Sequence, residues 1–514
     1  MFILEALEHY AKTDRIAIRY HDEQVSFAAL NRMSDAFAAY LRRTLPDDGR
    51  PVMLYGHKQS VLPACMFGAL KAGRGYVPVD TTYPPDRAAQ ILRAAQPAVL
   101  VDLCAAGLSA EHTLCEAELA QILTQPAPSA PRSSWIRPEQ TAYLLFTSGS
   151  TGTPKGVQIT AGNLAAFHAG AAPWFARLPE GGAFLNEISY SFDVSVCALY
   201  EALSRGMTLW TADRQTLESP QALFALLREA KPDAWVSTPS LAEFCIHSAQ
   251  FCAELMPQVR QFLFCGEVLT KKLAAELMRR FPGVPVINAY GPTETTVFVT
   301  GVEITRDMLD ADEPLPIGRP FETVQAIIAD DHGRPLPDGE AGELLVLGEA
   351  VSPGYLGRPE LNEALFFRTE DGLRGYHTGD LCRMADGMLY YLGRLDGQIK
   401  LNGFRVELED VEQNLVKLPN IARAAVLPVW QDGRVTALTA FVLLEKPDGE
   451  SALQRARRIK TALAGCLPSY MIPRKILAVD SFPLNTNGKI DKKQLAAQLA
   501  SGAAGGAHEP IRRT

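Results

Sequence analysis

The chain has 514 residues, 47% of them hydrophobic and 21% charged, which is typical of a soluble globular protein of about two to four domains. Its formal net charge of -8 argues against a surface for polyanions, so we expect no nucleic-acid partner. The nine cysteines include no CxxC pair, which argues against a disulfide framework or a zinc site and favours a cytoplasmic protein with reduced thiols.

The N-terminal segment, residues 1–15, is predicted to form an amphipathic helix, because Glu5 and Glu8 interrupt its apolar residues and break any signal-peptide core. No apolar stretch approaches the ~20 residues that span a bilayer, so we expect no membrane insertion. From residue 51 onward β-rich runs alternate with helical stretches, which predicts parallel and mixed sheets with flanking helices. The β-rich runs are VMLY (52–55), YVPVD (76–80), AVLVD (98–102), AYLLF (142–146), QFLFCGE (261–267) and VINAYG (286–291).

A domain boundary is predicted near residues 393–403, where glycines and charges separate the apolar run LYYL from a helix beginning at about Glu407. The residues beyond it predict a compact α+β segment, with helices at 408–418 and 452–467 and strands at 424–430, 437–444 and 476–480. The tail from Ser501 has too little apolar content to pack. We therefore expect a large N-terminal domain, 1–395, a small C-terminal domain, 396–500, and a disordered tail, 501–514.

The stretch TSGSTGTPKG, residues 147–156, follows the strand-like run AYLLF and combines glycines, serines and threonines with one lysine. The backbone N–H groups and hydroxyls of such a loop can wrap a polyphosphate, although an ordinary surface loop has the same composition. The chain has neither the GxxxxGK[ST] spacing of a P-loop NTPase nor a GxSxG nucleophile elbow. The stretch is therefore a phosphate-loop candidate outside those two folds.

This loop is similar to the phosphate-binding signature of the adenylate-forming superfamily, which includes peptide-synthetase adenylation domains and acyl-CoA synthetases. Further motifs match that superfamily in order along the chain: KAGRGYVPVD (71–80), FDVSV (192–196), NAYGPTET (288–295), YHTGDL (376–381), GRLDGQIKLNGFRVE (393–407) and NGKID (487–491). The resemblance implies the fold of these enzymes, a large α/β core followed by a small mobile domain. It also implies that ATP adenylates a carboxylate substrate.

The resemblance implies an ATP site and one metal ligand. Glu294 is implied to hold Mg²⁺, a cation that prefers oxygen ligands and substrate phosphates. The residues implied to bind ATP are Thr147, Ser148, Gly149, Ser150, Thr151 and Lys155 at the phosphates, Asn288 and Tyr290 at adenine, Asp380 at the ribose and Arg394 at the ribose or phosphates, together with Ala289, Thr293 and Lys489. Taken alone, Asp380 could instead cap a turn and Glu294 could be a solvated turn residue.

Other residues are implied to serve the chemical steps. Lys489 is implied to stabilise the charge that builds as the substrate carboxylate meets the α-phosphate, and loss of such a donor typically costs about 10² to 10³ in rate. Asp396 matches the hinge about which the small domain rotates between an adenylating and a thiol-transferring arrangement. That rotation would withdraw Lys489 and bring the segment from Lys400 towards the active site. Glu294 and Arg394 complete the implied catalytic set, and a rigid glycine-rich turn is the alternative interpretation of the hinge.

Asp193 corresponds to the position where the α-amino acid enzymes of the superfamily pair an Asp with the substrate ammonium. Because a charge-assisted bond of this type contributes about 1.5 to 3 kcal/mol, an amino acid is favoured over a plain acid. The other positions implied to line the pocket carry no charge, which favours a small uncharged substrate side chain: Phe192, Val194, Cys197, Ser237, Leu263, Cys265, Gly266, Ala289, Val297 and Phe298.

Within the superfamily, the segments 184–203, 235–245, 262–269 and 469–476 are most similar to the stand-alone D-alanine carrier-protein ligases. Cys265 resembles the cysteine that crowds the side of an L-methyl group in those ligases. The implied substrate is D-alanine, and the implied partner is a separate carrier protein that bears phosphopantetheine. We expect a monomer, and a basic set on one helix, Arg455, Arg457, Arg458 and Lys460, could help dock an acidic carrier or simply be solvated.

Three alternatives stay open at this stage. Phe298 and Cys197 differ from the residues expected in D-alanine ligases, so activation of glycine, L-alanine, serine or proline in non-ribosomal peptide or other secondary-metabolite biosynthesis is one alternative. An acyl-CoA or aryl-acid ligase is another, although Asp193 argues against it. The third is a non-catalytic member of the superfamily, which is disfavoured because the implied functional residues are all present, namely Lys155, Glu294, Asp380, Arg394 and Lys489.

Overall fold

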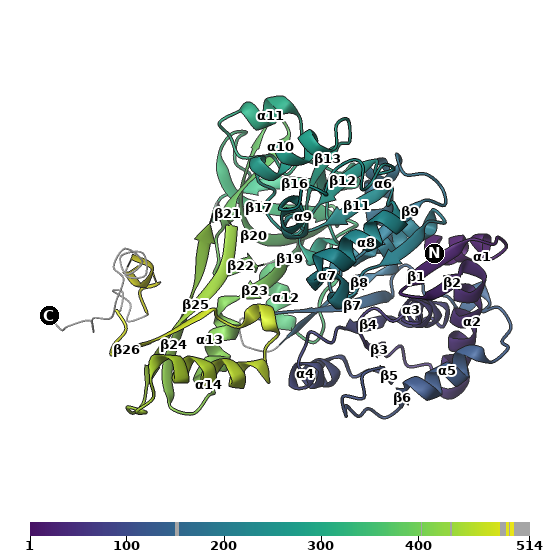
Figure 1. Cartoon of the computed structure of the whole chain (residues 1–514), viewed down its shortest axis with the longest axis horizontal. Helices are drawn as coiled ribbons and strands as arrows, with labels where there is room; N and C mark the ends of the chain where they lie inside the picture. Colours follow the sequence, from purple (N-terminus) through teal and green to yellow (C-terminus); the bar gives the residue numbers. More distant parts are fainter. Residues whose placement is uncertain (150–153, 402, 432–433, 484–489, 493, 498–514) are drawn as a thin grey trace. The chain divides into compact units, whose positions relative to one another are not determined.

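The computed structural model describes residues 1–149, 154–401, 403–431, 434–483, 490–492 and 494–497. These residues form two compact units, the first with three sheets and the second with one (Figure 1). The first unit holds the described parts of Met1–Thr147, Pro154–Asp396 and Asn402–Phe404, and the second holds those of Ser148–Thr153, Gly397–Leu401 and Arg405–Thr514. No helix in these described parts is long and apolar enough to cross a membrane.

A nine-stranded sheet is the largest element of the first unit. Its central strands are parallel, whereas the pairings β1–β2, β13–β14 and β14–β15 towards its edges are antiparallel. The strand order is β15 (Arg319–Pro320), β14 (Thr300–Glu303), β13 (Val286–Tyr290), β12 (Gln261–Phe264), β11 (Ala234–Ser237), β9 (Ala183–Asn186), β10 (Thr208–Thr211), β1 (Ile16–Tyr20) and β2 (Glu23–Ser26).

A seven-stranded sheet holds the remaining parallel strands of this unit. Three of its neighbouring short strands, β3, β4 and β5, are buried along their whole length, as expected for parallel strands covered on both faces. The order is β18 (Gly354–Tyr355), β8 (Lys155–Thr160), β7 (Thr141–Thr147), β4 (Tyr76–Val79), β3 (Val52–Tyr55), β5 (Val99–Asp102) and β6 (Thr113–Cys115). All six β-rich runs predicted from the sequence form strands of these two sheets.

A third, wholly antiparallel sheet precedes the end of the first unit. Its order is β16 (Val324–Ala329), β17 (Ala341–Gly348), β20 (Arg374–Ala385) and β19 (Phe366–Arg368), with β21 (Met388–Arg394) paired to β20. The register of β20 and β21 sets Asp380 directly opposite Arg394. Two residues predicted to bind the ribose are thus cross-strand neighbours.

Helices cover both large sheets. The predicted N-terminal helix is confirmed as α1 (Phe2–Tyr10), which buries Ile3, Leu4 and Leu7. The others in this unit are α2 (Phe27–Thr44), α3 (Leu62–Lys71), α4 (Pro85–Ala95), α5 (Glu116–Thr124), α6 (Ala161–Phe175), α7 (Arg214–Glu218), α8 (Pro220–Ala230), α9 (Pro239–Ile246), α10 (Lys271–Arg280), α11 (Arg306–Asp310) and α12 (Pro359–Leu365). Short 3₁₀ turns are η1 (Arg132–Ser134), η2 (Asp193–Ser195) and η4 (Thr293–Thr295), and η3 (Cys197–Ala202) is a π-helix.

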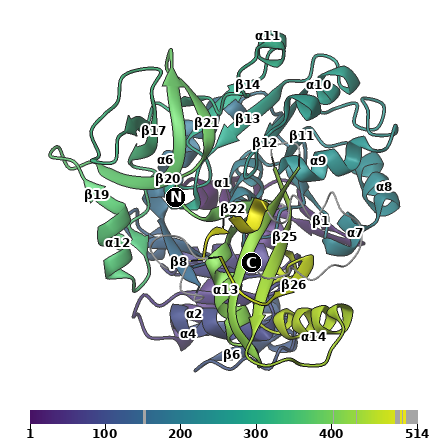
Figure 2. The same ribbon diagram turned by 90° about the vertical axis from the view of Figure 1, so that its left-hand side faces the viewer.

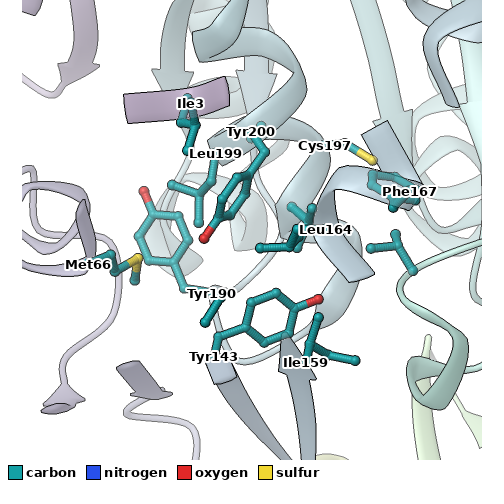
Figure 3. Packing of buried hydrophobic residues seen from close by; sticks show 14 of the residues in the cluster. Ile3, Met66, Tyr143, Ile159, Leu164, Phe167, Tyr190, Cys197, Leu199 and Tyr200 are labelled. Atoms are coloured by element: carbon teal, nitrogen blue, oxygen red, sulfur yellow. The ribbon is translucent and has the colours of Figure 1, made fainter. Parts of the chain in front are cut away.

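The largest hydrophobic core joins residues of both large sheets with residues of α3, α6 and η3. Figure 3 shows part of it, including Tyr143 of β7, Leu164 and Phe167 of α6 and Tyr200 of the π-helix. A second core lies under α8, α9 and α10, which cover the other face of the nine-stranded sheet (Figure 2). The mixed α/β fold predicted from the sequence is therefore confirmed.

The second unit is an α+β structure, as the sequence predicts. Its sheet has the order β23 (Phe404–Glu407), β22 (Gln398–Leu401), β25 (Arg434–Leu444) and β24 (Ile421–Gln431), with β26 (Lys475–Val479) paired to β25. Its helices are α13 (Leu408–Val416) and α14 (Ala452–Ala464), and η5 (Ser469–Met471) is a 3₁₀ turn.

The basic helix α14 uses most of its charges within its own unit. Arg455 and Arg458 both form ion pairs with Asp448, and Arg458 also pairs with Glu450. Lys460 Nζ donates to the carbonyl oxygen of Arg474 at 2.6 Å. These bonds favour a structural role for the helix charges over a docking patch, since paired charges attract a partner weakly.

Candidate active site

The predicted site residues of the first unit follow the carboxyl ends of its strands. Thr147 is the last residue of β7, Asp193 follows β9, Cys265 follows β12, and Thr293 and Glu294 follow β13. Ligands of open α/β sheets bind in the crevice outside the carboxyl ends of the strands. Residues that are far apart in the sequence thus share the edges at which a substrate is expected.

The strands β7 and β8 hold the two ends of the phosphate-loop candidate. Thr147 and Lys155 are cross-strand partners in this antiparallel pair, so the loop begins and ends at one place. Thr147 Oγ1 is buried and meets no hydrogen-bond partner among the described residues. Lys155 is buried, with Nζ 5.1 Å from the centre of the Tyr355 ring. The hydroxyl of Ser148, which groups with the second unit, donates to the carbonyl oxygen of Arg405 at 2.9 Å.

Glu294 lies in η4 with no exposed surface. The hydroxyl of Tyr355 donates to Glu294 Oε1 at 2.5 Å, and the carbonyl oxygen of Glu294 accepts from the amide of Ser352 at 2.8 Å. The two residues after η4, Thr296 and Val297, have φ of 64° and 70°. Such left-handed values are strained for β-branched residues and occur mainly at functional sites, where the surrounding structure enforces them.

Asp380 is the centre of a buried polar network. Its Oδ1 accepts from Arg394 Nη1 at 2.7 Å, and its Oδ2 accepts from the hydroxyl of Tyr290. Arg394 also forms a bidentate ion pair with Asp396, in which Nε donates to Oδ1 at 2.7 Å and Nη2 donates to Oδ2 at 2.5 Å. Burial, and then the neighbouring Asp380 carboxylate, raise the pKa of Tyr290 well above its usual value, so Tyr290 stays a neutral donor. The guanidinium of Arg394 thus bonds both the predicted hinge residue, Asp396, and the predicted ribose ligand, Asp380.

Two residues complete the surroundings of this network. Gly379 has φ +69°, and a Cβ there would lie 2.8 Å from Arg394 Nη2 and 3.0 Å from Asp396 Oδ2. Its amide donates to Glu343 Oε1 at 2.9 Å, and Glu343 Oε2 pairs with His377 Nδ1 at 2.9 Å. Burial acts to raise the pKa of Glu343, but the bonds from His377 and Gly379 outweigh it and hold that pKa below its usual value.

The adenine-side candidates lie on or just after β13. Asn288 is buried, and its Nδ2 donates to the carbonyl oxygen of Pro316 at 2.7 Å, which fixes the orientation of the side-chain amide. Ala289 is also buried. The hydroxyl of Thr293 donates to Asp193 Oδ2, in the predicted amino-acid site, at 2.7 Å. Thr293 therefore links the predicted nucleotide motif to the predicted substrate motif.

Asp193 begins η2 and is only 4% exposed. Phe192 precedes it and lies over Gly266, where a Cβ would be 3.1 Å from the phenylalanine ring and φ is +92°. Gly266 is therefore required for this close approach. The burial of the Asp193 carboxylate removes it from water and strengthens its interaction with any cation that enters.

The apolar pocket candidates are all buried: Val194, Cys197, Leu263, Cys265, Val297 and Phe298. Phe298 stands edge-on to Phe167, with ring centres 5.1 Å apart, and to Phe321, at 5.8 Å. Ser237 is buried too, and its hydroxyl is used internally, since it accepts from Trp235 Nε1 and donates to the carbonyl oxygen of Thr238, each at 2.7 Å. Ser237 therefore presents little unused polarity to a substrate.

Some predicted residues cannot be compared with the structure. Lys489, Ser150 and Thr151 lie outside the described residues. The same holds for the tail 501–514. Gly149 is described and buried, and Lys400 lies on β22 of the second unit.

The sequence did not single out three residues that contact the candidates. Tyr355 donates to Glu294, Glu343 accepts from Gly379, and Thr378 Oγ1 accepts from the amide of Asp380 at 3.0 Å. Thr378 stands within the YHTGDL motif and could have been chosen from it. Tyr355 and Glu343 lie in other stretches, and only the strand pairing brings them to the site.

Comparison with known proteins decides the family. A family model described as AMP-binding enzyme matches residues 7–356, and one described as AMP-binding enzyme C-terminal domain matches residues 410–489. This chain belongs to the AMP-binding enzymes. The superfamily predicted from the ordered motifs is therefore confirmed.

Curated relatives of this AMP-binding enzyme match over almost the whole chain. A protein from Bacillus velezensis is 38% identical, over 97% of this chain and 100% of the relative, and one from Listeria innocua is 40% identical, over 97% and 99%. Both are named D-alanine--D-alanyl carrier protein ligase. Among solved structures, holo-PA1221, an NRPS protein containing adenylation and PCP domains, is similar at a TM-score of 0.81 and 26% identity, over 96% of this chain and 84% of that one.

Proposed function

We propose that this protein is an ATP-dependent ligase that activates D-alanine as D-alanyl-AMP and transfers it to the phosphopantetheine thiol of a separate carrier protein. The observation that carries the proposal is the buried Asp193 carboxylate, bonded to Thr293, in a chain that matches relatives named D-alanine--D-alanyl carrier protein ligase from end to end. A buried carboxylate beside a nucleotide motif suits a substrate that carries an ammonium as well as a carboxylate.

In the first half-reaction the D-alanine carboxylate attacks the α-phosphorus of ATP, and the bond to pyrophosphate breaks. Asp380 would accept hydrogen bonds from the ribose hydroxyls, and Arg394, which donates to Asp380 Oδ1, would hold the carboxylate in place. The Asn288 side chain, oriented by Pro316, would turn its oxygen to the amino edge of adenine, and the Tyr290 ring would face the base. Thr147 supports a phosphate role, because its buried hydroxyl meets no partner in the described residues and a phosphate oxygen would supply one.

A magnesium ion suits the donor set near the phosphate-loop candidate. Glu294 offers a fully buried carboxylate, and Mg²⁺ is commonly held by one or two carboxylates together with substrate phosphates. The described residues contain no group of three or more His, Cys, Asp or Glu side chains that could hold a metal. When bound, the ion would neutralise charge on the polyphosphate. Lys155 would add a second positive charge there.

Asp193 would receive the ammonium of D-alanine. We infer that the surrounding apolar side chains, all uncharged, would accept a small side chain, and Cys265 would face the side on which an L-methyl group projects. A single sulfur can separate the two enantiomers by about 1 to 3 kcal/mol, as for one misplaced methylene. The remaining pocket residues are proposed as shape-defining contacts.

In the second half-reaction the phosphopantetheine sulfur attacks the activated carbonyl, and AMP leaves. We propose Asp396 as the hinge between a large domain, 1–395, and a small one, 396–500. Two observations support this proposal. The chain passes from one compact unit to the other between Asp396 and Gly397, and Arg394 Nε donates a hydrogen bond to Asp396 Oδ1. Lys489 would act in adenylation, and Lys400 would approach for transfer. We expect a cytoplasmic protein with reduced thiols, in line with its nine free cysteines, and a monomer.

The proposal is tested by ATP–pyrophosphate exchange with D-alanine, L-alanine, glycine, D-serine, L-serine, L-proline and benzoate. D-alanine should support the fastest exchange, and a holo carrier protein should then become loaded with D-alanine. A preference for glycine, L-alanine, serine or proline would move the protein to secondary metabolism. Exchange with benzoate alone would overturn the amino-acid assignment, and exchange with none of these substrates would overturn the proposed function.

A further inference from the structure

Lys58 places its side-chain amine in the interior of the first unit. It follows β3, and its side chain has no solvent-accessible surface. Its Nζ donates to Asn186 Oδ1 at 2.8 Å and to the carbonyl oxygen of Ile188 at 2.5 Å, and lies 4.1 Å from the centre of the Tyr190 ring. Asn186 is the last residue of β9, and Ile188 and Tyr190 belong to the turn that follows it.

Burying this ammonium is unfavourable. Burial lowers the pKa of Lys58 below its usual value, although the nearby carboxylates of Glu187 and Asp80 favour the charged form. An apolar residue of similar volume would avoid this cost, as substitutions of buried ion pairs show in other proteins. The proposed nucleotide, phosphate and metal contacts also make no use of Lys58. Its partners therefore indicate what it does.

The turn 186–192 leads directly into Asp193. It is held from the other large sheet at two further points, since Ser189 Oγ donates to Asp80 Oδ2 at 2.6 Å and Ser191 Oγ donates to the carbonyl oxygen of Pro78 at 3.0 Å. Those two bonds fix the later half of the turn. Lys58 fixes the earlier half, where the chain leaves the nine-stranded sheet.

We propose that Lys58 is a positioning residue for amino-acid binding, whose bonds to Asn186 and Ile188 fix the turn that places the Asp193 carboxylate. This inference rests on the proposed role of Asp193 as the partner of the substrate ammonium. The inference predicts weaker binding of the amino acid without weaker binding of the nucleotide, because none of the proposed ATP contacts belongs to this turn.

Lys71 provides a matched control. It is also a buried lysine, and its Nζ bonds Asp35 Oδ1 and Asn31 Oδ1, each at 2.8 Å, so it joins α3 to α2 and has no bond to the turn 186–192. A purely structural loss should lower the fraction of folded enzyme and leave both KM values unchanged. Loss of positioning should raise KM for D-alanine and leave KM for ATP unchanged.

The experiment measures steady-state ATP–pyrophosphate exchange for wild type, Lys58→Met, Lys58→Gln and Lys71→Met, with D-alanine and ATP varied in turn and folding followed by thermal melting. We expect Lys58→Met to raise KM for D-alanine by about tenfold or more, the size of one lost charge-assisted hydrogen bond, with KM for ATP within about twofold of wild type. Lys58→Gln should shift KM in the same direction by less. Lys71→Met should lower the melting temperature only.

An unchanged KM for D-alanine in the Lys58 variants, or equal rises in both KM values, would overturn the inference. If Lys58→Met does not fold, the same criteria apply to Lys58→Gln. Failure of the proposed function is a different result, because wild type itself would then show no exchange with D-alanine. In that case the same comparison is made with whichever amino acid in the panel supports exchange, and the criteria stay the same.

Discussion

Replacing Asp193 by Asn removes the charge proposed to receive the substrate ammonium while keeping the shape of the side chain. The Thr293 hydroxyl, which donates to Asp193 Oδ2 at 2.7 Å, can donate equally to an amide oxygen, so the local conformation should persist. Because Asp193 is only 4% exposed, water cannot replace the lost charge. A charge-assisted hydrogen bond contributes about 1.5 to 3 kcal/mol, which corresponds to about a 10-fold to 150-fold loss of kcat/KM for D-alanine.

The assay is ATP–pyrophosphate exchange with D-alanine and, in parallel, propionate, which has the same carbon skeleton without the amine. The Asp193→Asn variant should lose kcat/KM for D-alanine by the stated factor, whereas KM for ATP should stay within about threefold and exchange with propionate should not fall. Equal losses with both substrates would show that the substitution damages the site generally. Unchanged D-alanine kinetics would refute the role of the charge.

Three further predictions concern the ribose network and the pocket. Gly379→Ala should lower the free energy of unfolding by about 1 to 2 kcal/mol, because of its left-handed φ, and should also raise KM for ATP, because its Cβ meets the guanidinium at 2.8 Å; thermal melting and exchange kinetics measure the two effects. Glu343→Gln should be less stable than wild type by about 1 kcal/mol at pH 7, as chemical denaturation would measure. The lowered pKa of Glu343 means that its carboxylate stabilises the fold above its usual pKa and loses this contribution as pH falls through the lowered value, so the two proteins should converge in acid. Cys265→Ala should raise kcat/KM for L-alanine relative to D-alanine by up to about 100-fold, because it removes the sulfur from the pocket.

Two of these predictions have a control variant within the chain. At Gly372, φ is +88° but a Cβ would meet nothing within 4 Å, so Gly372→Ala should destabilise the fold without changing KM for ATP. Cys245 is buried on α9, and Cys245→Ala should leave the preference between the alanine enantiomers unchanged. A constant stability difference between Glu343→Gln and wild type across acid pH would contradict the ionisation argument.

Local patterns in the sequence determined the class of fold. Short apolar runs such as 52–55 and 286–290 alternate with helical stretches, and each became a strand because burial and β propensity act within a few residues. The ordered motifs identified the superfamily for a related reason. Phosphate loops, turns and cross-strand pairs each need particular residue types at fixed spacing. The motifs that contain Asp193 and Asp380 can therefore be recognised from the sequence alone.

Tertiary structure decided which side chains meet across those motifs. Tyr355 donates to Glu294 although 61 residues separate them, and Lys58 donates to Ile188 although 130 residues separate them. Such pairs depend on which strands become neighbours and on the register between them, and no local pattern records either. The π-helix after Asp193 was likewise not predicted, since its wider turn is stabilised by packing in the shared core. The sequence alone therefore determined the chemistry available to this protein, whereas long-range packing decided how those groups are held.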